Sequence, residues 1–389
     1  MNQEKLCIGL DAKRAFCNYR GLGSYSRLLI ESLNYWHQDD LSLILFTPKI
    51  TLKGLEKWPS IQSKEDSITR KLPQGIYKLF PEVWRGYGQV DEWTSLGLNI
   101  YHGLSNEIPF TTNKNKLKNE NRVKTIVTIH DLIFIRKPEL YPWWDRWNYI
   151  RKVKYSCDKA DSIIALSEQT KEDLIEFLNV SESKIKTIYQ AVHPRFYKNE
   201  LQRTALRDIS NIQRPYLLFV GAFEERKNIL RLIKSYYSIK EKLHDHELVL
   251  IGRGGLLSEI EKLVKDLSLT IDVKILTNVS SEELPRYYQQ ATALLYPSLF
   301  EGFGLPIVEA LMSETIVMTS LGSCFPESAG KGAYFIDPYS EEQISQTMIE
   351  IVELNPQERL KRISKGLEHC KKFHWKQTSE ELVSHYKTL

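Results

Sequence analysis

The sequence lacks the features that would place it in a membrane or outside the cell. No stretch approaches the roughly 18 uninterrupted apolar residues that a membrane-spanning helix needs. The N-terminus, MNQEKLCIGLDAKR, contains acidic residues and no extended apolar segment, so it is unlike a secretory signal. We therefore expect a protein that is made and stays in the cytoplasm.

The sequence also has few cysteines and a small net charge. The five cysteines form no CxxC pair, which argues against a disulfide framework and against a zinc knuckle. The formal net charge is only +4, and no recognised nucleic-acid motif accompanies it, so a nucleic-acid partner is not expected. The excess lies in the first half, where residues 1–193 carry 28 Lys and Arg against 23 Asp and Glu. A basic N-terminal half suits an anionic partner or a membrane surface.

The 389 residues, with 42% hydrophobic and 26% charged side chains, are typical of a soluble globular chain of two domains. Short apolar, β-branched runs alternate with longer amphipathic stretches, which predicts parallel sheets covered by helices on both faces. Predicted strands are 6–11, 41–46, 98–102, 124–130, 162–166, 184–189, 215–221, 247–252, 272–276, 291–296, 315–319 and 333–336. Predicted helices include 23–36, 168–178, 228–243, 256–267, 281–290 and 340–353. The fold class is therefore α/β, with two doubly wound Rossmann-like domains, 1–193 and 194–373, whose strands end at a cleft.

The most informative motif runs from Tyr296 to Ala310, YPSLFEGFGLPIVEA. A strand ends, a loop with two glycines turns, and a helix begins with Pro306 near its first position. Backbone N–H groups at such a helix N-terminus can bind an anion or sugar hydroxyls. Glu301 lies in the loop, and Glu309 lies about one turn into the helix, where it can reach another part of the same ligand. The alternative interpretation is a capped helix with two solvated carboxylates.

This motif resembles the signature of the retaining glycosyltransferases of group 1 (family 4), which have the GT-B fold of two facing Rossmann-like domains. Glu301 and Glu309 match the family's E-x7-E element. Other family elements recur in order over essentially the whole chain: Gly21-Leu22-Gly23, Ile129-His130-Asp131, the run 220–228 (VGAFEERKN) and the turn Phe373-His374-Trp375. The last of these implies that a C-terminal helix, 374–389, returns to the first domain. The resemblance implies a nucleotide-sugar-binding domain at 194–373 and an acceptor-side domain at 1–193.

The resemblance also implies how the donor diphosphate is held. Arg226 and Lys227 follow strand 215–221, and two cations there can neutralise a leaving diphosphate, Arg with a planar fork and Lys as a point charge. The sequence departs from the family at Ala222, where many members have an arginine. Arg226 and Lys227 then act alone, or Arg253 in the glycine loop Gly252-Arg253-Gly254-Gly255 assists them. Without the resemblance, an Arg-Lys pair of this kind is a solvated loop pair.

The remaining candidate residues follow from the same resemblance. His130, at the carboxyl end of a strand, lines the reaction centre; considered alone, it is a buried core histidine. Gly21 and Gly23 are expected in a loop that approaches the donor phosphates and the acceptor. Further donor-binding residues are Val279 beside the base, Gly302, Phe303, Gly304 and Leu305 at the helix start, and Glu309 on the ribose.

Two other segments permit alternative interpretations. His244-Asp245-His246-Glu247 could suggest a metal site, but a solvated turn is preferred, because consecutive residues do not converge easily on one ion. The absence of a D-x-D element at a strand end agrees with a family that uses no metal. The segment 143–154, WWDRWNYIRKVK, mixes aromatic and basic residues. It could contact an anionic membrane or a lipid-linked acceptor, but we expect an amphipathic helix that buries its tryptophans against the first sheet.

Together these features predict a metal-independent, retaining transferase with no cofactor beyond its nucleotide-sugar substrate. The stretch Thr128-Ile129-His130-Asp131-Leu132, with 137–142 (KPELYP), resembles bacterial mannosyltransferases of O-antigen and exopolysaccharide synthesis. This suggests GDP-mannose as donor, a glycan or lipid-linked saccharide as acceptor, and peripheral contact with the inner membrane face. The alternatives are a UDP-hexose donor, a nucleotide-sugar 2-epimerase of the same fold, and a non-catalytic subunit, for which Ala222 is the support.

Overall fold

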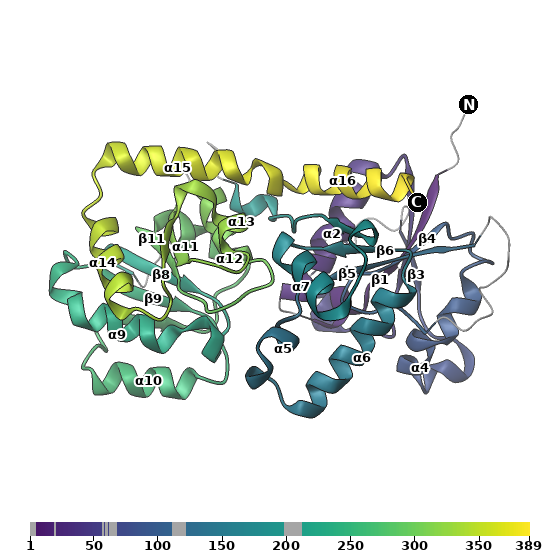
Figure 1. The fold of residues 1–389 in the computed structure, drawn as a ribbon, viewed down its shortest axis with the longest axis horizontal. Helices are drawn as coiled ribbons and strands as arrows, with labels where there is room; N and C mark the ends of the chain where they lie inside the picture. The colour runs from purple at the N-terminus through teal and green to yellow at the C-terminus, as the bar shows by residue number, and fades with distance from the viewer. Residues whose placement is uncertain are drawn as a thin grey trace. The chain divides into compact units, whose positions relative to one another are not determined.

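The computed structural model describes residues 5–18, 21–56, 58, 61, 68–110, 122–197 and 212–389. It divides the chain into two compact units, residues 1–191 with 375–389 and residues 192–374 (Figure 1). These boundaries differ from the predicted ones by two residues at 191/192 and by one residue at 374/375.

The first unit contains a parallel sheet in the order β3-β2-β1-β4-β5-β6-β7. Its strands are β1 (Leu6–Asp11), β2 (Leu41–Phe46), β3 (Ile68–Lys71), β4 (Ile100–Gly103), β5 (Lys124–Ile129), β6 (Ser162–Ala165) and β7 (Ile185–Thr187). Its helices are α1 (Lys13–Cys17), α2 (Gly21–His37), α3 (Leu52–Glu56), α4 (Pro81–Gly86), α5 (Ile133–Arg136), α6 (Trp143–Lys159), α7 (Glu168–Leu178) and α16 (Trp375–Lys387). The central strands are almost wholly buried and apolar, as expected of strands covered on both faces.

The second unit repeats this architecture with a parallel sheet in the order β10-β9-β8-β11-β12-β13. Its strands are β8 (Tyr216–Val220), β9 (Glu247–Ile251), β10 (Val273–Leu276), β11 (Ala293–Tyr296), β12 (Ile316–Ser320) and β13 (Tyr334–Ile336). Its helices are α9 (Ile229–Ile239), α10 (Leu257–Asp266), α11 (Leu284–Gln290), α12 (Leu305–Met312), α13 (Phe325–Ala329), α14 (Glu341–Val352) and α15 (Pro356–Cys370). Figure 1 shows α9 and α10 on one side of this sheet and α15 on the other. The predicted fold class, two doubly wound α/β units, is confirmed.

Helix α16 belongs to the first unit, although residues 192–374 separate it from the rest of that unit. The hydroxyl of Tyr386 is hydrogen-bonded to His102 Nδ1 at 2.7 Å, and His385 Nε2 is hydrogen-bonded to Ser162 Oγ at 2.8 Å. Tyr386 and Leu382 are buried in the core beneath β1 and β4. These contacts fix α16 to the sheet through both polar and apolar groups.

Two local predictions in the first unit are wrong. Helix α2 begins at Gly21, so Gly21 and Gly23 lie in its first turn and not in a loop ahead of it. A Cβ on Gly23 would lie 1.9 Å from the carbonyl oxygen of Asn18, so close backbone approach explains this glycine. The tryptophans of α6 are not buried against the sheet, because Trp143 and Trp144 are each 62% exposed. The face of α6 that packs on the core carries smaller side chains, such as Val153 and Cys157.

Among the described residues, no helix is long and apolar enough to cross a membrane.

Candidate active site

The second unit brings Arg226, Lys227 and Glu301 into one cluster. Strands β8 and β11 are neighbours, so the loops that follow them leave the same edge of the sheet. The loop after β8 forms a short 3₁₀ turn, Glu225–Lys227, and Leu299 N–H donates to the Arg226 carbonyl at 2.7 Å. Arg226 Nη1 forms an ion pair with Glu301 Oε2 at 2.6 Å, and Lys227 Nζ donates to Glu301 Oε1. Lys227 also donates to the hydroxyl of Tyr296, the last residue of β11.

The Glu301 carboxylate lies buried between the side chains of Arg226 and Lys227. Lys227 and Glu301 are only 5% and 7% exposed. Burial opposes the ionisation of Glu301, but the attraction of Lys227 and Arg226 outweighs it and lowers the pKa of Glu301 to about 2. Burial opposes the charge of Arg226 as well, while Glu301 raises the pKa of the guanidinium above its ordinary value. Arg226 Nε also pairs with Glu224 Oε2 at 3.2 Å, so two cations here face two carboxylates.

The helix start after this loop has the expected geometry. Gly304 precedes α12 with φ +85°, a left-handed conformation that favours glycine, and Pro306 occupies the first turn. Leu305 is the first helical residue, and the positive end of the α12 dipole therefore lies close to Phe303 and Gly302 in sequence. Phe303 itself is buried, with its ring 5.3 Å from that of Phe373.

Glu309 has partners different from those of the 226–227–301 cluster. Tyr288 of α11 donates its hydroxyl to Glu309 Oε2 at 2.9 Å. Burial raises the pKa of Glu309 to about 7, despite the opposing effects of this hydrogen bond and of Arg195. Glu309 therefore gains and loses its proton near neutral pH, unlike Glu301.

The glycine loop after β9 packs against the loop after β8. A Cβ on Gly252 would lie 1.8 Å from the Gly221 carbonyl oxygen, and one on Gly254 would lie 2.2 Å from the Phe223 carbonyl oxygen. Both glycines are explained by this close backbone approach. Arg253 is exposed, and its Nε donates to the Thr277 carbonyl just after β10. Val279 follows in the same loop and is half-buried.

In the first unit, His130 follows β5 and is buried. Its Nε2 donates to the Leu104 carbonyl at 2.9 Å, and its backbone N–H donates to Asn106 Oδ1 at 2.7 Å. The Tyr25 ring lies edge-on, with 4.7 Å between ring centroids. Burial lowers the pKa of His130 to about 4, so the imidazole is neutral at physiological pH. Because Nε2 holds the proton, Nδ1 has the free lone pair. His130 lines a pocket of about 250 Å³ together with Arg14, Asn106 and Asp131.

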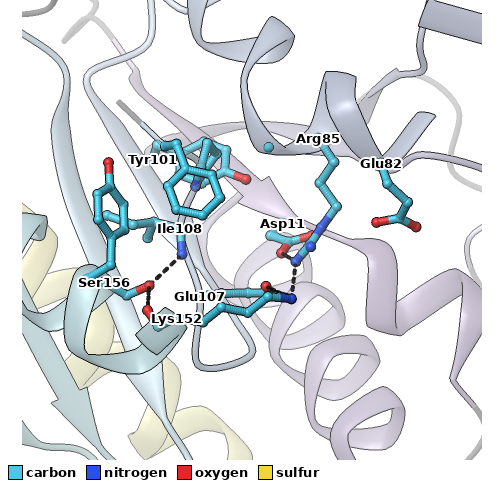
Figure 2. Close-up of a pocket in the computed structure, with 12 residues that line it drawn as sticks. Asp11, Glu82, Arg85, Tyr101, Glu107, Ile108, Lys152 and Ser156 are labelled. Atoms are coloured by element: carbon cyan, nitrogen blue, oxygen red, sulfur yellow. Dashed lines mark hydrogen bonds and ion pairs between the residues drawn. The ribbon is translucent and has the colours of Figure 1, made fainter. Parts of the chain in front are cut away.

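A second polar pocket of the first unit was not anticipated from the sequence (Figure 2). Figure 2 shows Arg85 of α4 reaching the carboxylates of Asp11 and Glu107, with Nη2 at 2.5 Å from Asp11 Oδ2 and 2.9 Å from Glu107 Oε1. Burial disfavours the charge of Glu107, but Arg85 and Lys152 together lower its pKa to about 2. The cavity measures about 150 Å³. Asp11 ends β1 and Glu107 follows the neighbouring β4. The position of these two carboxylates after strands is the one feature of the sequence that could have indicated this pocket. Nothing in the sequence pointed to Arg85.

Within the residues that the structure describes, no three His, Cys, Asp or Glu side chains form a group that could hold a metal ion. The side chains of residues 244–247 make other contacts. His246 Nδ1 donates a hydrogen bond to the Leu243 carbonyl at 2.6 Å, and Asp245 forms an ion pair with Arg214 at 2.8 Å.

Comparison with known proteins agrees with this architecture and identifies the family. Residues 202–369 match the family model described as glycosyl transferases group 1, and residues 33–196 match the model described as glycosyltransferase family 4. The O-antigen chain mannosyltransferase RfbU of Salmonella typhimurium is 30% identical over 288 residues, which cover 72% of this chain and 73% of that protein. The chain belongs to the group 1 glycosyltransferases.

Another member of the family, O-antigen chain mannosyltransferase B of Escherichia coli, is 27% identical to this glycosyltransferase over 295 residues. That alignment covers 75% of this chain and 74% of the relative. Among solved structures, HepE of Anabaena in complex with UDP aligns with a TM-score of 0.74 at 14% identity, covering 99% of this chain and all of that one. A glycosyltransferase from Rickettsia africae aligns with a TM-score of 0.73 at 16% identity, covering 99% of both chains. These likenesses establish the GT-B fold, whose two Rossmann-like units the sheets display.

Proposed function

We propose that this glycosyltransferase is a retaining hexosyltransferase that transfers mannose from GDP-mannose to a glycan or lipid-linked oligosaccharide during the synthesis of a cell-surface polysaccharide. The names of the two mannosyltransferase relatives support the sugar and the pathway class. The observation that carries the reaction type is the Arg226–Glu301–Lys227 cluster, because it places two cations at one strand-end edge of the nucleotide-binding unit. We also propose a cytoplasmic location, on the side where nucleotide sugars are made.

The charges of this cluster suit departure of a nucleoside diphosphate. When the bond between the anomeric carbon and the phosphate oxygen breaks, its electron pair goes to the diphosphate. Arg226 and Lys227 stabilise that charge, and the α12 N-terminus adds the positive end of its dipole. The acceptor oxygen forms its bond on the face that the diphosphate leaves, and its proton passes to the departing phosphate. With these fixed charges the step needs no metal ion and no cofactor.

Other residues of the site position the two substrates. Glu301 keeps its contacts with Arg226 and Lys227 when the diphosphate binds to them, and it faces the positive charge that develops on the sugar. Glu309 accepts hydrogen bonds from the ribose hydroxyls. The neutral imidazole of His130 offers Nδ1 as an acceptor to a hydroxyl of the donor sugar.

The test is an assay of the purified chain with GDP-mannose and a panel of UDP-hexoses, with a lipid-linked acceptor present or absent. We expect transfer from GDP-mannose, retention of the anomeric configuration in the product by NMR, and no loss of activity with a chelator. Lys227→Ala should lower kcat/KM by about 10- to 100-fold, the worth of one charge-assisted contact. Lys262→Ala, an exposed residue on α10, is the matched control.

Three results would contradict the proposal. Transfer from UDP-sugars alone would exclude mannose from GDP-mannose. Isomerisation of the donor without an acceptor would indicate an epimerase. Inverted product would exclude the retaining mechanism.

A further inference from the structure

The first turns of α6 expose three tryptophans on one short stretch of helix. Trp143 and Trp144 are each 62% exposed and Trp147 is 53% exposed. The rings of Trp143 and Trp144 stack with centroids 3.5 Å apart. By contrast Trp58, Trp84 and Trp93, also of the first unit, are each 1% exposed. Large aromatic groups gathered at the surface in this way mark a contact surface.

Basic side chains accompany the tryptophans along the same helix face. Residues 143, 147, 151 and 154 follow the helical repeat, so Trp143, Trp147, Arg151 and Lys154 lie on one face. The guanidinium of Arg151 lies 4.9 Å from the centre of the Trp147 ring. Helix α6 has five Lys or Arg residues and only two Asp residues. The face therefore combines amphipathic aromatic rings with excess positive charge.

This surface adjoins the polar pocket of Figure 2, since α6 contributes Lys152, Tyr155 and Ser156 to its lining. Helix α4 contributes the facing residues Arg85 and Gly86. The segment that contains α4 also exposes apolar side chains, namely Ile76 (71%), Leu79 (76%), Phe80 (55%) and Val83 (49%). Exposed apolar groups thus occur on both elements that enclose the pocket.

We propose that the α6 surface, Trp143, Trp144, Trp147, Arg151 and Lys154, docks this glycosyltransferase on an anionic phospholipid bilayer. Tryptophan is favoured at the boundary between headgroups and acyl chains, because its ring is apolar and its N–H is polar. Lysine and arginine beside it attract anionic headgroups. The charge excess selects a lipid surface over an apolar protein partner. The reason for docking rests on the proposed function, since a lipid-linked acceptor lies in such a bilayer surface. The docking itself is argued from the exposed side chains alone.

The experiment is flotation of the full chain with vesicles of phosphatidylglycerol and phosphatidylcholine, compared with phosphatidylcholine alone. We expect binding to the anionic vesicles that weakens as salt rises, because salt screens the attraction. Changing Trp143, Trp144 and Trp147 to Ser should lower the partition coefficient by roughly tenfold for each ring. Arg151→Gln with Lys154→Gln should lower it by about fivefold for each charge. The control removes three apolar groups elsewhere that are more exposed than the tryptophans, with Leu52, Ile271 and Leu360 changed to Ser.

A second readout remains informative if the triple variant folds poorly. Brominated lipid should quench tryptophan fluorescence of the wild-type chain, and Trp144→Ser alone should reduce that quenching. The proposal is overturned if the chain does not float with anionic vesicles, or if the tryptophan variant and the control bind equally. It is also overturned if the tryptophans instead govern self-association without vesicles. Flotation needs no sugar nucleotide, so its failure is distinguishable from failure of the transferase activity.

Discussion

Replacing Glu301 by Gln should tighten the binding of a free nucleoside diphosphate while it slows sugar transfer. In the structure Glu301 Oε2 lies 2.6 Å from Arg226 Nη1, and its other oxygen accepts from Lys227. A diphosphate bound to the same cations would lie about 7 Å from this carboxylate, with the cations between the two anions. At an effective dielectric constant of about 20, that repulsion is about 2 kcal/mol per unit charge. Removing it corresponds to roughly thirtyfold in Kd.

The measurement is calorimetric titration of GDP and of UDP into the wild-type chain and Glu301→Gln, with kcat measured alongside. Glu350→Gln is the matched control, because this exposed α14 residue makes the same charge change away from the cluster. The thermal midpoint of Glu301→Gln should fall, since charge-assisted hydrogen bonds worth about 2 kcal/mol become neutral ones. If Glu301→Gln instead weakens GDP and UDP binding while it stays folded, Glu301 does not repel a bound diphosphate and our argument is wrong.

Three further predictions concern pH and packing. Because burial raises the pKa of Glu309 to about 7 from 4.5, the folded state binds its proton more tightly, and stability falls as pH rises through this interval. Glu309→Gln should therefore raise the thermal midpoint at pH 8, relative to pH 4, by the equivalent of about 3 kcal/mol. Glu342→Gln should leave this pH dependence unchanged. Because the pKa of His130 is about 4 instead of 6.5, the stability of the folded state rises with pH between these values. His130→Ala should abolish that rise, as measured by thermal melting at several pH values, and should lower kcat. Gly252→Ala should destabilise the second unit by about 3 kcal/mol in chemical unfolding, because its Cβ would lie 1.8 Å from the Gly221 carbonyl oxygen. Gly255→Ala is the control, because a Cβ at that position has open space. Equal stability of the two variants would contradict this prediction.

Much of the fold follows from the sequence because both sheets are buried on two faces. Strands such as β8 (Tyr216–Val220) are continuous apolar runs, and this pattern is typical of strands buried on both faces of a parallel sheet. Strand β3, Ile68–Lys71, was missed because it is an edge strand with the polar residues Thr69, Arg70 and Lys71. The start of α2 was predicted two residues late, because glycines usually favour a loop and the sequence does not show the close backbone contact that requires Gly23.

The candidate site divides in the same way. Residues at strand ends that belong to one motif, such as Lys227 and Glu301, could be predicted as neighbours because adjacent parallel strands end at one edge. The partner of Glu309 could not, because Tyr288 comes from α11 and no local pattern links the two. The exposure of the α6 tryptophans was missed because helical periodicity identifies two faces and does not say which of them packs on the sheet.

The position of α16 affects the order in which the two units can form during translation. Residues 192–374 leave the ribosome before residues 375–389, although the first unit starts the chain. The second unit can therefore complete its core while His102 and Ser162 still lack their α16 partners. The unit synthesised first is thus the later one to be completed, and its exposed β1–β4 surface is where a nascent chain of this protein is open to chaperones.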